Sequence, residues 1–400
     1  MSGVLQYEAP PQWVRYDKMA VADELTLAKA MVMSLTSIPF QRSWAEKLQA
    51  MELKREIAGT SKIEGADFTD RELDDALAEK PTKELLTRSQ RQARAASTTY
   101  RWLGELSPDR AIDVNLIKEI HRRIVTNCDD DHCAPGELRG EFQNVVFGRP
   151  RHRGVEGGGE CERTLSRLID AVNHEFPAHD LLIQALAVHY HLGAMHPFQD
   201  GNGRTARAVE ALMLRRGKMK DTLFIAMSNY YYDEKDQYLA SLAEVRAKNY
   251  DLTPFLKFGL RGIATQCQRL LGEIRIHVEK SLFRELMGKM YGRLESTRKR
   301  ALAKRELAIL DKLLDRDEAI DYLEFYGPLF REYKDLKNPG EAYVRDLNHL
   351  TTLGAISIKQ EGTRFFIAAR LEWATEITET EFYKRVNQMP YAKTKLIVSA

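Results

Sequence analysis

The residues best suited to chemistry lie together at 196–207, where the sequence reads His-Pro-Phe-Gln-Asp-Gly-Asn-Gly-Arg-Thr-Ala-Arg. An apolar run at 181–195 precedes them, and apolar residues continue at mostly helical spacing through 205–216. The segment is therefore predicted to be a loop that links two helices and opens the second one. Gly201 and Gly203 can adopt backbone angles that side chains forbid, so successive N–H groups can converge on an anion at the helix N-terminus.

Four side chains of this segment complete the predicted chemistry. Arg204 and Arg207 are three positions apart, so both guanidinium groups can reach the same polyphosphate. Asp200 offers the hard oxygen that Mg²⁺ prefers between phosphates. His196 is a candidate general base, because its ring titrates near neutral pH. The segment is thus predicted to bind a nucleotide-like polyphosphate and to activate a hydroxyl beside it.

Composition sets broad limits on the rest of the chain. Its 400 residues, 44% hydrophobic and 30% charged, are typical of a soluble globular protein with two or three domains. A net charge of +2 points to neither nucleic acid nor membrane. No apolar run has the length of a membrane span, and the N-terminus does not have the pattern of a secretory signal. We therefore expect a cytoplasmic protein without membrane contact.

The four cysteines are too few for a disulfide scaffold in a chain of this length. Cys128 and Cys133 bracket Asp129, Asp130, Asp131 and His132. This spacing fits no standard zinc pattern, so we interpret 128–133 as an exposed acidic loop.

Helical patterns dominate the first half of the chain. Residues 1 to about 20 contain Pro10-Pro11 and several aromatic residues, and are predicted to be an extended arm or edge strand. Helices are then predicted at 19–37, from 44 to a terminator at Gly65, at 69–77 and at 87–106. A core is predicted to begin near Ala111, with a strand at 142–147 and a glycine-rich flap after it.

The last hundred residues have a different pattern. After a basic connector at 296–304, helices are predicted at 307–314 and 341–353. Two short β-rich runs follow at 356–358 and 365–367. Helices followed by a hairpin are typical of a winged helix-turn-helix.

The 196–207 segment resembles the Fic (Fido-fold) family, because it matches His-Pro-Phe-x-x-Gly-Asn-Gly-Arg-x-x-Arg at every defining position. Two other stretches are similar to family segments, namely Gly136-x-x-Arg139 with 144–148 before the flap, and Pro254-Phe255 at the end of the core. The resemblance implies a mainly α protein, with a helical Fido core, a small β-hairpin flap and a C-terminal winged helix-turn-helix. We accordingly divide the chain into an N-terminal arm and helices (1–110), a Fido core (111–262), a connecting helix (263–298), a winged-helix domain (299–372) and a tail (373–400).

Fic proteins mostly transfer AMP from ATP to a protein hydroxyl. The resemblance therefore implies ATP and Mg²⁺, and a Ser, Thr or Tyr hydroxyl of a target protein or of the chain itself. By position it implies that His196 deprotonates the hydroxyl, that Phe198 anchors the loop and that Asp200 holds Mg²⁺. It also implies the nucleotide contacts, with Asn202 on the α-phosphate: Gly201, Asn202, Gly203, Arg204, Thr205, Arg207, Tyr238, and Val146, Phe147 and Gly148 of the flap.

A second motif, Thr60-Ser61-Lys62-Ile63-Glu64-Gly65 at 60–65, resembles the family's inhibitory motif Ser/Thr-x-x-x-Glu-Gly/Asn. Its glutamate is predicted to make a bidentate pair with Arg207, which removes a phosphate partner and places negative charge where phosphate belongs. We therefore expect an autoinhibited protein adenylyltransferase.

Three alternatives stay open. Glu64 can instead orient a water that removes AMP from a modified protein, and a nucleotide other than ATP can fit a motif that contacts phosphates. The winged helix can bind DNA, since 341–353 offers Arg345, Asn348 and His349. The acidic Glu341 and Asp346 of the same helix favour a protein-interaction role over DNA. The family resemblance also makes a homodimer the expected assembly.

Overall fold

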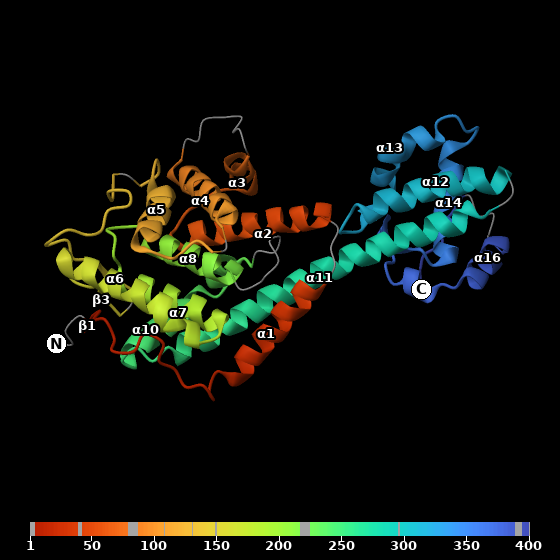
Figure 1. Cartoon of the computed structure of the whole chain (residues 1–400). Helices are drawn as coiled ribbons and strands as arrows, with labels where there is room; N and C mark the ends of the chain where they lie inside the picture. Colours follow the sequence, from red (N-terminus) through yellow and green to blue (C-terminus); the bar gives the residue numbers. More distant parts are fainter. Residues whose placement is uncertain are drawn as a thin grey trace. The chain divides into compact units, whose positions relative to one another are not determined.

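The computed structural model describes residues 5–38, 42–78, 87–107, 109–129, 131–148, 150–216, 225–294, 297–388 and 394–399. The chain divides into two compact units, Met1–Leu271 and Gly272–Ala400 (Figure 1). The predicted N-terminal domain and core domain therefore belong to one unit. The predicted boundary after residue 262 falls inside a single continuous helix, α11 (Thr253–Gly292), which runs through both units.

The first unit is built almost entirely of helices. In chain order they are α1 (Ala22–Ser37), α2 (Arg42–Ile63), α3 (Asp70–Leu77), α4 (Arg88–Glu105), α5 (Val114–Val125), α6 (Gly159–His174), the 3-10 turn η1 (Phe176–Ala178), α7 (Leu181–Met195), α8 (Asn202–Arg216), α9 (Met227–Asp233), α10 (Lys235–Ala247) and the start of α11. Helix α7 is apolar around most of its circumference and is buried along nearly its whole length. It packs against α8, and α8 also packs against α5, so the loop between α7 and α8 is held by a rigid core.

Local sequence determines where α2 ends and where α3 and α4 begin. Helix α2 ends where Gly65 adopts a left-handed φ of +88°. Thr69 caps α3 in a capping box with Glu72, and Thr87 caps α4 in a capping box with Gln90. The second box fixes the start of α4, and therefore the direction of the side chains in its first turn.

A small sheet lies at one end of the first unit, in the order β1–β3–β2. Strand β1 (Leu5–Gln6) pairs in parallel with β3 (His152–Arg153), and β2 (Val146–Phe147) pairs with β3 antiparallel. The predicted strand at 142–147 is shortened to its last two residues. Phe142 has a left-handed φ of +67°, and the N–H groups of Gln143 and Asn144 bond to the carbonyl oxygens of Gly140 and Phe142 in a turn. The hairpin of β2 and β3 is the predicted flap, and the N-terminal arm pairs through β1 with its β3 edge.

The second unit places a three-stranded antiparallel sheet against helices. Its elements are the end of α11, α12 (Thr297–Leu314), β4 (Ile320–Asp321), α13 (Tyr322–Tyr333), α14 (Pro339–Leu353), β5 (Ile356–Glu361), β6 (Arg364–Ala369), α15 (Trp373–Glu376) and α16 (Glu379–Asn387). The strand order is β4–β6–β5. Two helices and the hairpin occur where the sequence predicts them, whereas β4 and α13 were not predicted and the basic connector forms the first part of α12. Among the described residues, none of the helices combines the length and apolarity that a bilayer crossing requires.

Candidate active site

The loop between α7 and α8 turns through two residues with left-handed backbone, His196 (φ +48°) and Gly201 (φ +72°). His196 Nδ1 lies within hydrogen-bond distance of the Gly193 carbonyl oxygen. Because a carbonyl oxygen can only accept, we assign the proton to Nδ1 and the lone pair to Nε2. The ring is therefore oriented so that Nε2 can accept a proton.

The flap covers this base. The ring of Phe147 stacks on that of His196, with centroids 3.3 Å apart and planes inclined by 14°. Burial lowers the pKa of His196 to about 3, so the imidazole is unprotonated at pH 7 and does not titrate near neutral pH as the sequence analysis expects. Phe147 therefore lies on the base, while Val146 is 37% exposed and Gly148 forms a turn with φ +76°. The nucleotide contacts of these three flap residues stay predictions.

Arg139 ties the flap to the loop. Its side chain is fully buried, and its Nε donates to the carbonyl oxygen of His196 at 2.6 Å. Its Nη1 and Nη2 groups donate to the carbonyl oxygens of Gln143 and Val155. Its backbone N–H donates to the Pro197 carbonyl oxygen at 2.9 Å. The sequence singled out Arg139 only as part of the segment before the flap, and the structure shows it holding the backbone on both sides of the base.

His121 of α5 supports the loop from below. Its ring stacks on the buried ring of Phe198, with centroids 3.7 Å apart. Its Nδ1 accepts a hydrogen bond from the N–H of Gly136 at 2.9 Å, so its Nε2 carries the proton and donates to the carbonyl oxygen of Asp200 at 3.0 Å. Burial lowers the pKa of His121 to about 4, in agreement with this neutral tautomer.

Asp200 presents its carboxylate at the open side of the loop. One oxygen, Oδ1, accepts a hydrogen bond from the N–H of Gly201 at 2.6 Å. The side chain is 39% exposed. An oriented, accessible carboxylate suits the oxygen coordination that Mg²⁺ requires, so the donor set at this position fits the ion.

Asn202 braces the loop from within. Its Oδ1 accepts a hydrogen bond from the N–H of Phe198 at 2.9 Å, and its Nδ2 donates to the Phe198 carbonyl oxygen at 2.8 Å. The contact between Asn202 and an α-phosphate stays a prediction. Thr205, one turn further along α8, has a buried hydroxyl without a hydrogen-bond partner among the described residues.

Arg204 pairs with Asp129, a residue that the sequence analysis places in an exposed loop. Its Nη1 donates to Oδ2 of Asp129, and both side chains are buried, at 3% and 0% exposure. The expectation of an exposed acidic loop at 128–133 is therefore wrong for Asp129 and for both cysteines, which are also buried. Burial alone would raise the pKa of Asp129, but the Arg204 charge and the hydrogen bonds from Arg204, Arg88 and Gln92 together outweigh it and hold that pKa below its ordinary value. A buried arginine needs a carboxylate partner, and this requirement could have indicated that one of the acidic residues in 128–133 is buried.

Arg207 binds the end of α2. Its Nη2 donates to Glu64 Oε1 at 2.6 Å and its Nε donates to Thr60 Oγ1 at 2.9 Å. The predicted bidentate pair is thus replaced by one bond to Glu64 and two to Thr60, whose carbonyl oxygen also accepts from Nη2 at 3.3 Å. Both residues face the same guanidinium group because they are one helical turn apart. Burial would raise the pKa of Glu64, but Arg207 and then Arg204 hold it below its ordinary value.

The Glu64 carboxylate also lies at the start of α8. A Cβ built on Gly203 would be 2.6 Å from Glu64 Oε1, so only glycine allows the carboxylate to approach this closely. The unpaired N–H groups and positive dipole of a helix N-terminus attract negative charge. Glu64 therefore occupies the position predicted for a phosphate, directly after α2 and before the left-handed Gly65.

Tyr238 of α10 lies in the core behind Arg207. It is 4% exposed, and its hydroxyl is 2.9 Å from Nε2 of His189, which in turn contacts Glu210. Burial raises the pKa of Tyr238 to about 12, against the opposing charge of Arg207. A contact between Tyr238 and an adenine ring stays a prediction.

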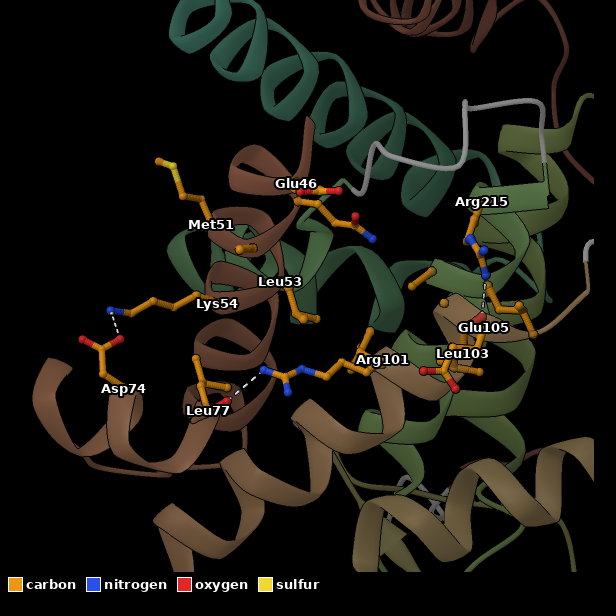
Figure 2. Close-up of a pocket in the computed structure, with 16 residues that line it drawn as sticks. Glu46, Met51, Leu53, Lys54, Asp74, Leu77, Arg101, Leu103, Glu105 and Arg215 are labelled. Atoms are coloured by element: carbon orange, nitrogen blue, oxygen red, sulfur yellow. Dashed lines mark hydrogen bonds and ion pairs between the residues drawn. The ribbon is translucent and has the colours of Figure 1, made fainter. Parts of the chain in front are cut away.

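A separate hollow of about 700 Å³ lies among α2, α3, α4 and α8, on a part of α2 well before Glu64 (Figure 2). Its cations are already engaged: Lys54 pairs with Asp74, Arg101 donates to the Leu77 carbonyl oxygen, and Arg215 donates to that of Leu103. No residue of the 196–207 loop lines it. The hollow is therefore distinct from the site around His196.

Comparison with known sequences agrees with the geometry. Residues 111–214 match the model of the Fic/DOC family. The protein adenylyltransferase fic-1 of Caenorhabditis elegans is 30% identical over 165 residues, which are 41% of this chain and 30% of that protein. The protein adenylyltransferase Fic of Culex quinquefasciatus is 34% identical over 150 residues, 37% of this chain and 27% of that protein. The chain thus spans about three-tenths of the length of these curated relatives.

Two solved structures share the fold. A Fic family protein from Desulfovibrio desulfuricans G20 has a TM-score of 0.57 and 16% identity, with 91% of this chain and 98% of that chain covered. Fic-1 from C. elegans has a TM-score of 0.51 and 22% identity, with 64% of this chain and 74% of that chain covered.

Proposed function

We propose that this chain, which carries a Fic/DOC family domain over residues 111–214, is a protein adenylyltransferase that rests in an inhibited state. The observation that carries the proposal is the placement of one free base nitrogen, His196 Nε2, on the loop that begins α8 with Arg204 and Arg207. A base beside an anion-binding helix N-terminus suits transfer of a phosphate-linked group to a hydroxyl.

The proposed reaction follows from these groups. His196 Nε2 takes the proton of a target hydroxyl, whose oxygen attacks the α-phosphorus of ATP. The bond from that phosphorus to the bridging oxygen of the β-phosphate breaks, and pyrophosphate leaves. Arg204 and Arg207 neutralise the polyphosphate, so most of the catalysis is positioning and charge stabilisation. Mg²⁺ on Asp200 would add positive charge to the phosphates when bound.

The inhibited state rests on Glu64. It holds Arg207 and lies against Gly203, so ATP cannot place a phosphate on this arginine while Glu64 stays there. The rest of α2 is firmly docked. Glu52 pairs with Arg269, and Glu56 accepts hydrogen bonds from the N–H and hydroxyl of Ser228.

Removal of AMP from a modified protein is the second candidate. One observation favours it: the Glu64 side chain is 33% exposed although it binds a buried arginine, so its free oxygen can orient a water. Incubation with an AMP-modified lysate separates the two activities by mass spectrometry. Gain of AMP on proteins supports transfer, whereas loss supports removal.

We do not extend the proposal to DNA, because the candidate contacts of α14 are used internally. Arg345 pairs with Asp346, and His349 contacts Glu306. Asn348 Nδ2 donates to the carbonyl oxygen of Lys395, and its Oδ1 accepts from the N–H of Ile397. The C-terminal tail therefore lies on the helix that would have to enter a groove. A protein-interaction role for this unit and a homodimer remain our expectations.

The test compares wild type with Glu64→Gly in labelled ATP. We expect strong protein labelling by Glu64→Gly, weak labelling by wild type, and none when His196→Ala is added. Repeating the assay with the other nucleoside triphosphates identifies the preferred base. Equal weak labelling by wild type and Glu64→Gly would contradict the inhibitory role of Glu64.

A further inference from the structure

We propose that Arg88, which lies outside the Fic/DOC domain at the first position of α4, is a third polyphosphate-binding cation of this site. The inference rests on the proposed function and adds a residue to its nucleotide site. It starts from the partner of Arg204. Oδ2 of Asp129 accepts from Arg204, whereas Oδ1 accepts from Arg88, with Arg88 Nε at 2.6 Å. Two guanidinium groups therefore share one buried carboxylate.

The same two arginines also face Asp200. Arg88 Nη2 is 3.7 Å from Asp200 Oδ2, and Arg204 Nη2 is 3.8 Å from Asp200 Oδ1. Arg88, Arg204, Asp129 and Asp200 thus form a ring of alternating charge, which we call the charge ring. The contacts with Asp129 are hydrogen bonds, but those with Asp200 are too long for one. The ring is therefore fixed on the Asp129 side and loosely held on the Asp200 side.

The Asp129 side of the charge ring is buried, and the Asp200 side is exposed to solvent. Asp129 and Arg204 are 0% and 3% exposed, whereas Arg88 and Asp200 are 47% and 39% exposed. A ligand that reaches the Asp200 carboxylate therefore meets the Arg88 guanidinium group beside it. In the described part of the chain, Nη1 of Arg88 has no hydrogen-bond or ion-pair partner, so at least this group is available to a ligand.

Charge indicates the kind of ligand. The two arginines and two aspartates of the charge ring cancel, so the ring as it stands attracts neither sign strongly. A cation bound at Asp200 would take that carboxylate from Arg88 and leave positive charge facing solvent. A metal-bound polyphosphate supplies both parts at once, a cation for Asp200 and phosphate oxygens for Arg88.

Arg88 is held in place for this role by its helix. The capping box of Thr87 and Gln90 fixes the first turn of α4. One turn later, Gln92 Nε2 also donates to Asp129, at 3.0 Å. Helix α4 thus positions both Arg88 and the carboxylate that orients it. Its guanidinium group is preorganised, so little conformational entropy is lost when it binds a phosphate.

The test measures nucleotide binding in a Glu64→Gly, His196→Ala parent, which binds without turnover. Arg88→Gln removes the charge but keeps a donor for Asp129. We expect its affinity for ATP to fall about tenfold, as for loss of a charged hydrogen bond, with its affinity for AMP within about twofold of the parent. Arg88→Lys should keep part of the ATP affinity. The control Arg163→Gln, on an arginine of α6 that is 70% exposed and pairs with Glu160, should match the parent.

The outcomes separate the inference from the proposed function. Equal losses for ATP and AMP in Arg88→Gln would mean that Arg88 only supports Asp129, and no loss would mean that it does not bind the ligand; either overturns the inference. A thermal melt of each variant shows whether it folds, and Arg88→Lys carries the test if Arg88→Gln does not. A folded parent that binds no nucleotide would contradict the proposed function itself.

Discussion

Arg204 and Arg207 leave the same helix and are equally buried, yet they meet carboxylates of different kinds. Asp129 is completely buried and is also held by Arg88 and Gln92. Glu64 comes from the end of a helix outside the Fic/DOC domain, and its side chain is 33% exposed. A buried charge needs a partner, but the partner can be permanent or replaceable. Under the proposed function, Asp129 is a permanent partner of Arg204, and Glu64 is a partner of Arg207 that a phosphate replaces.

The largest expected effect is a loss of stability on changing Asp129, the permanent partner of Arg204. Asp129→Asn removes the carboxylate that is hydrogen-bonded to the buried Arg204 and leaves it the longer contact with Asp200, at 3.8 Å, so we expect a loss of about 3–5 kcal/mol in the free energy of unfolding. Urea denaturation measures it. Asp131→Asn is the matched control, because Asp131 is two residues away and 77% exposed, and it should change stability little. Equal stability of both variants would show that Asp129 is no more structural than its neighbour.

A smaller effect, on labelling activity, is expected at Thr60, which binds Arg207 beside Glu64. Thr60→Val keeps the shape but removes the hydroxyl that accepts from Arg207 Nε. Loss of one hydrogen bond to a charged group is worth about 1.5–3 kcal/mol, so we expect roughly ten- to hundredfold more labelling with ATP than in wild type. Thr98→Val on α4, where the hydroxyl bonds only to carbonyl oxygens of its own helix, is the control. Unchanged labelling in Thr60→Val would assign the inhibition to Glu64 alone.

The smallest effect is a dependence on pH. The folded-state pKa of Glu64 lies below its ordinary value of 4.5, so the ionised form is favoured in the folded chain. Its stabilisation is present above about pH 4.5 and is lost as the pH falls through the folded pKa. Because the side chain is a third exposed, we expect only about 1 kcal/mol between wild type and Glu64→Gln at pH 7. Denaturation at several pH values should show this difference shrinking in acid, and a constant difference would show that charge is not its source.

The sequence predicted those parts of the site that lie in one short segment. The 196–207 loop, the helices around it and the pairing of Glu64 with Arg207 follow from a motif and from helical periodicity. Asp129 and Arg88 were missed because their partners are 75 and 41 residues away along the chain, at separations where periodicity carries no information.

Short-range patterns could not show which backbone hydrogen bonds form. The amide of Asn202 satisfies the buried backbone of Phe198, a structural role that the sequence did not indicate. The β-forming residues before Phe147 predicted a longer strand, but the N–H groups of Gln143 and Asn144 bond to carbonyl oxygens in a turn instead.

The last turn of α2 can fray without the rest of the helix. Glu56 is anchored on Ser228, and a Cβ on Gly59 would lie only 2.4 Å from the Ser228 backbone, so the helix is clamped up to that point. Beyond Gly59 only one turn remains before Gly65, and a glycine within a helix costs about 1 kcal/mol relative to alanine. That turn carries the Thr60 and Glu64 contacts to Arg207, which are the inhibitory contacts of the proposed function. Unwinding it requires less free energy than undocking α2, so a local opening that leaves the core intact would be enough to free Arg207.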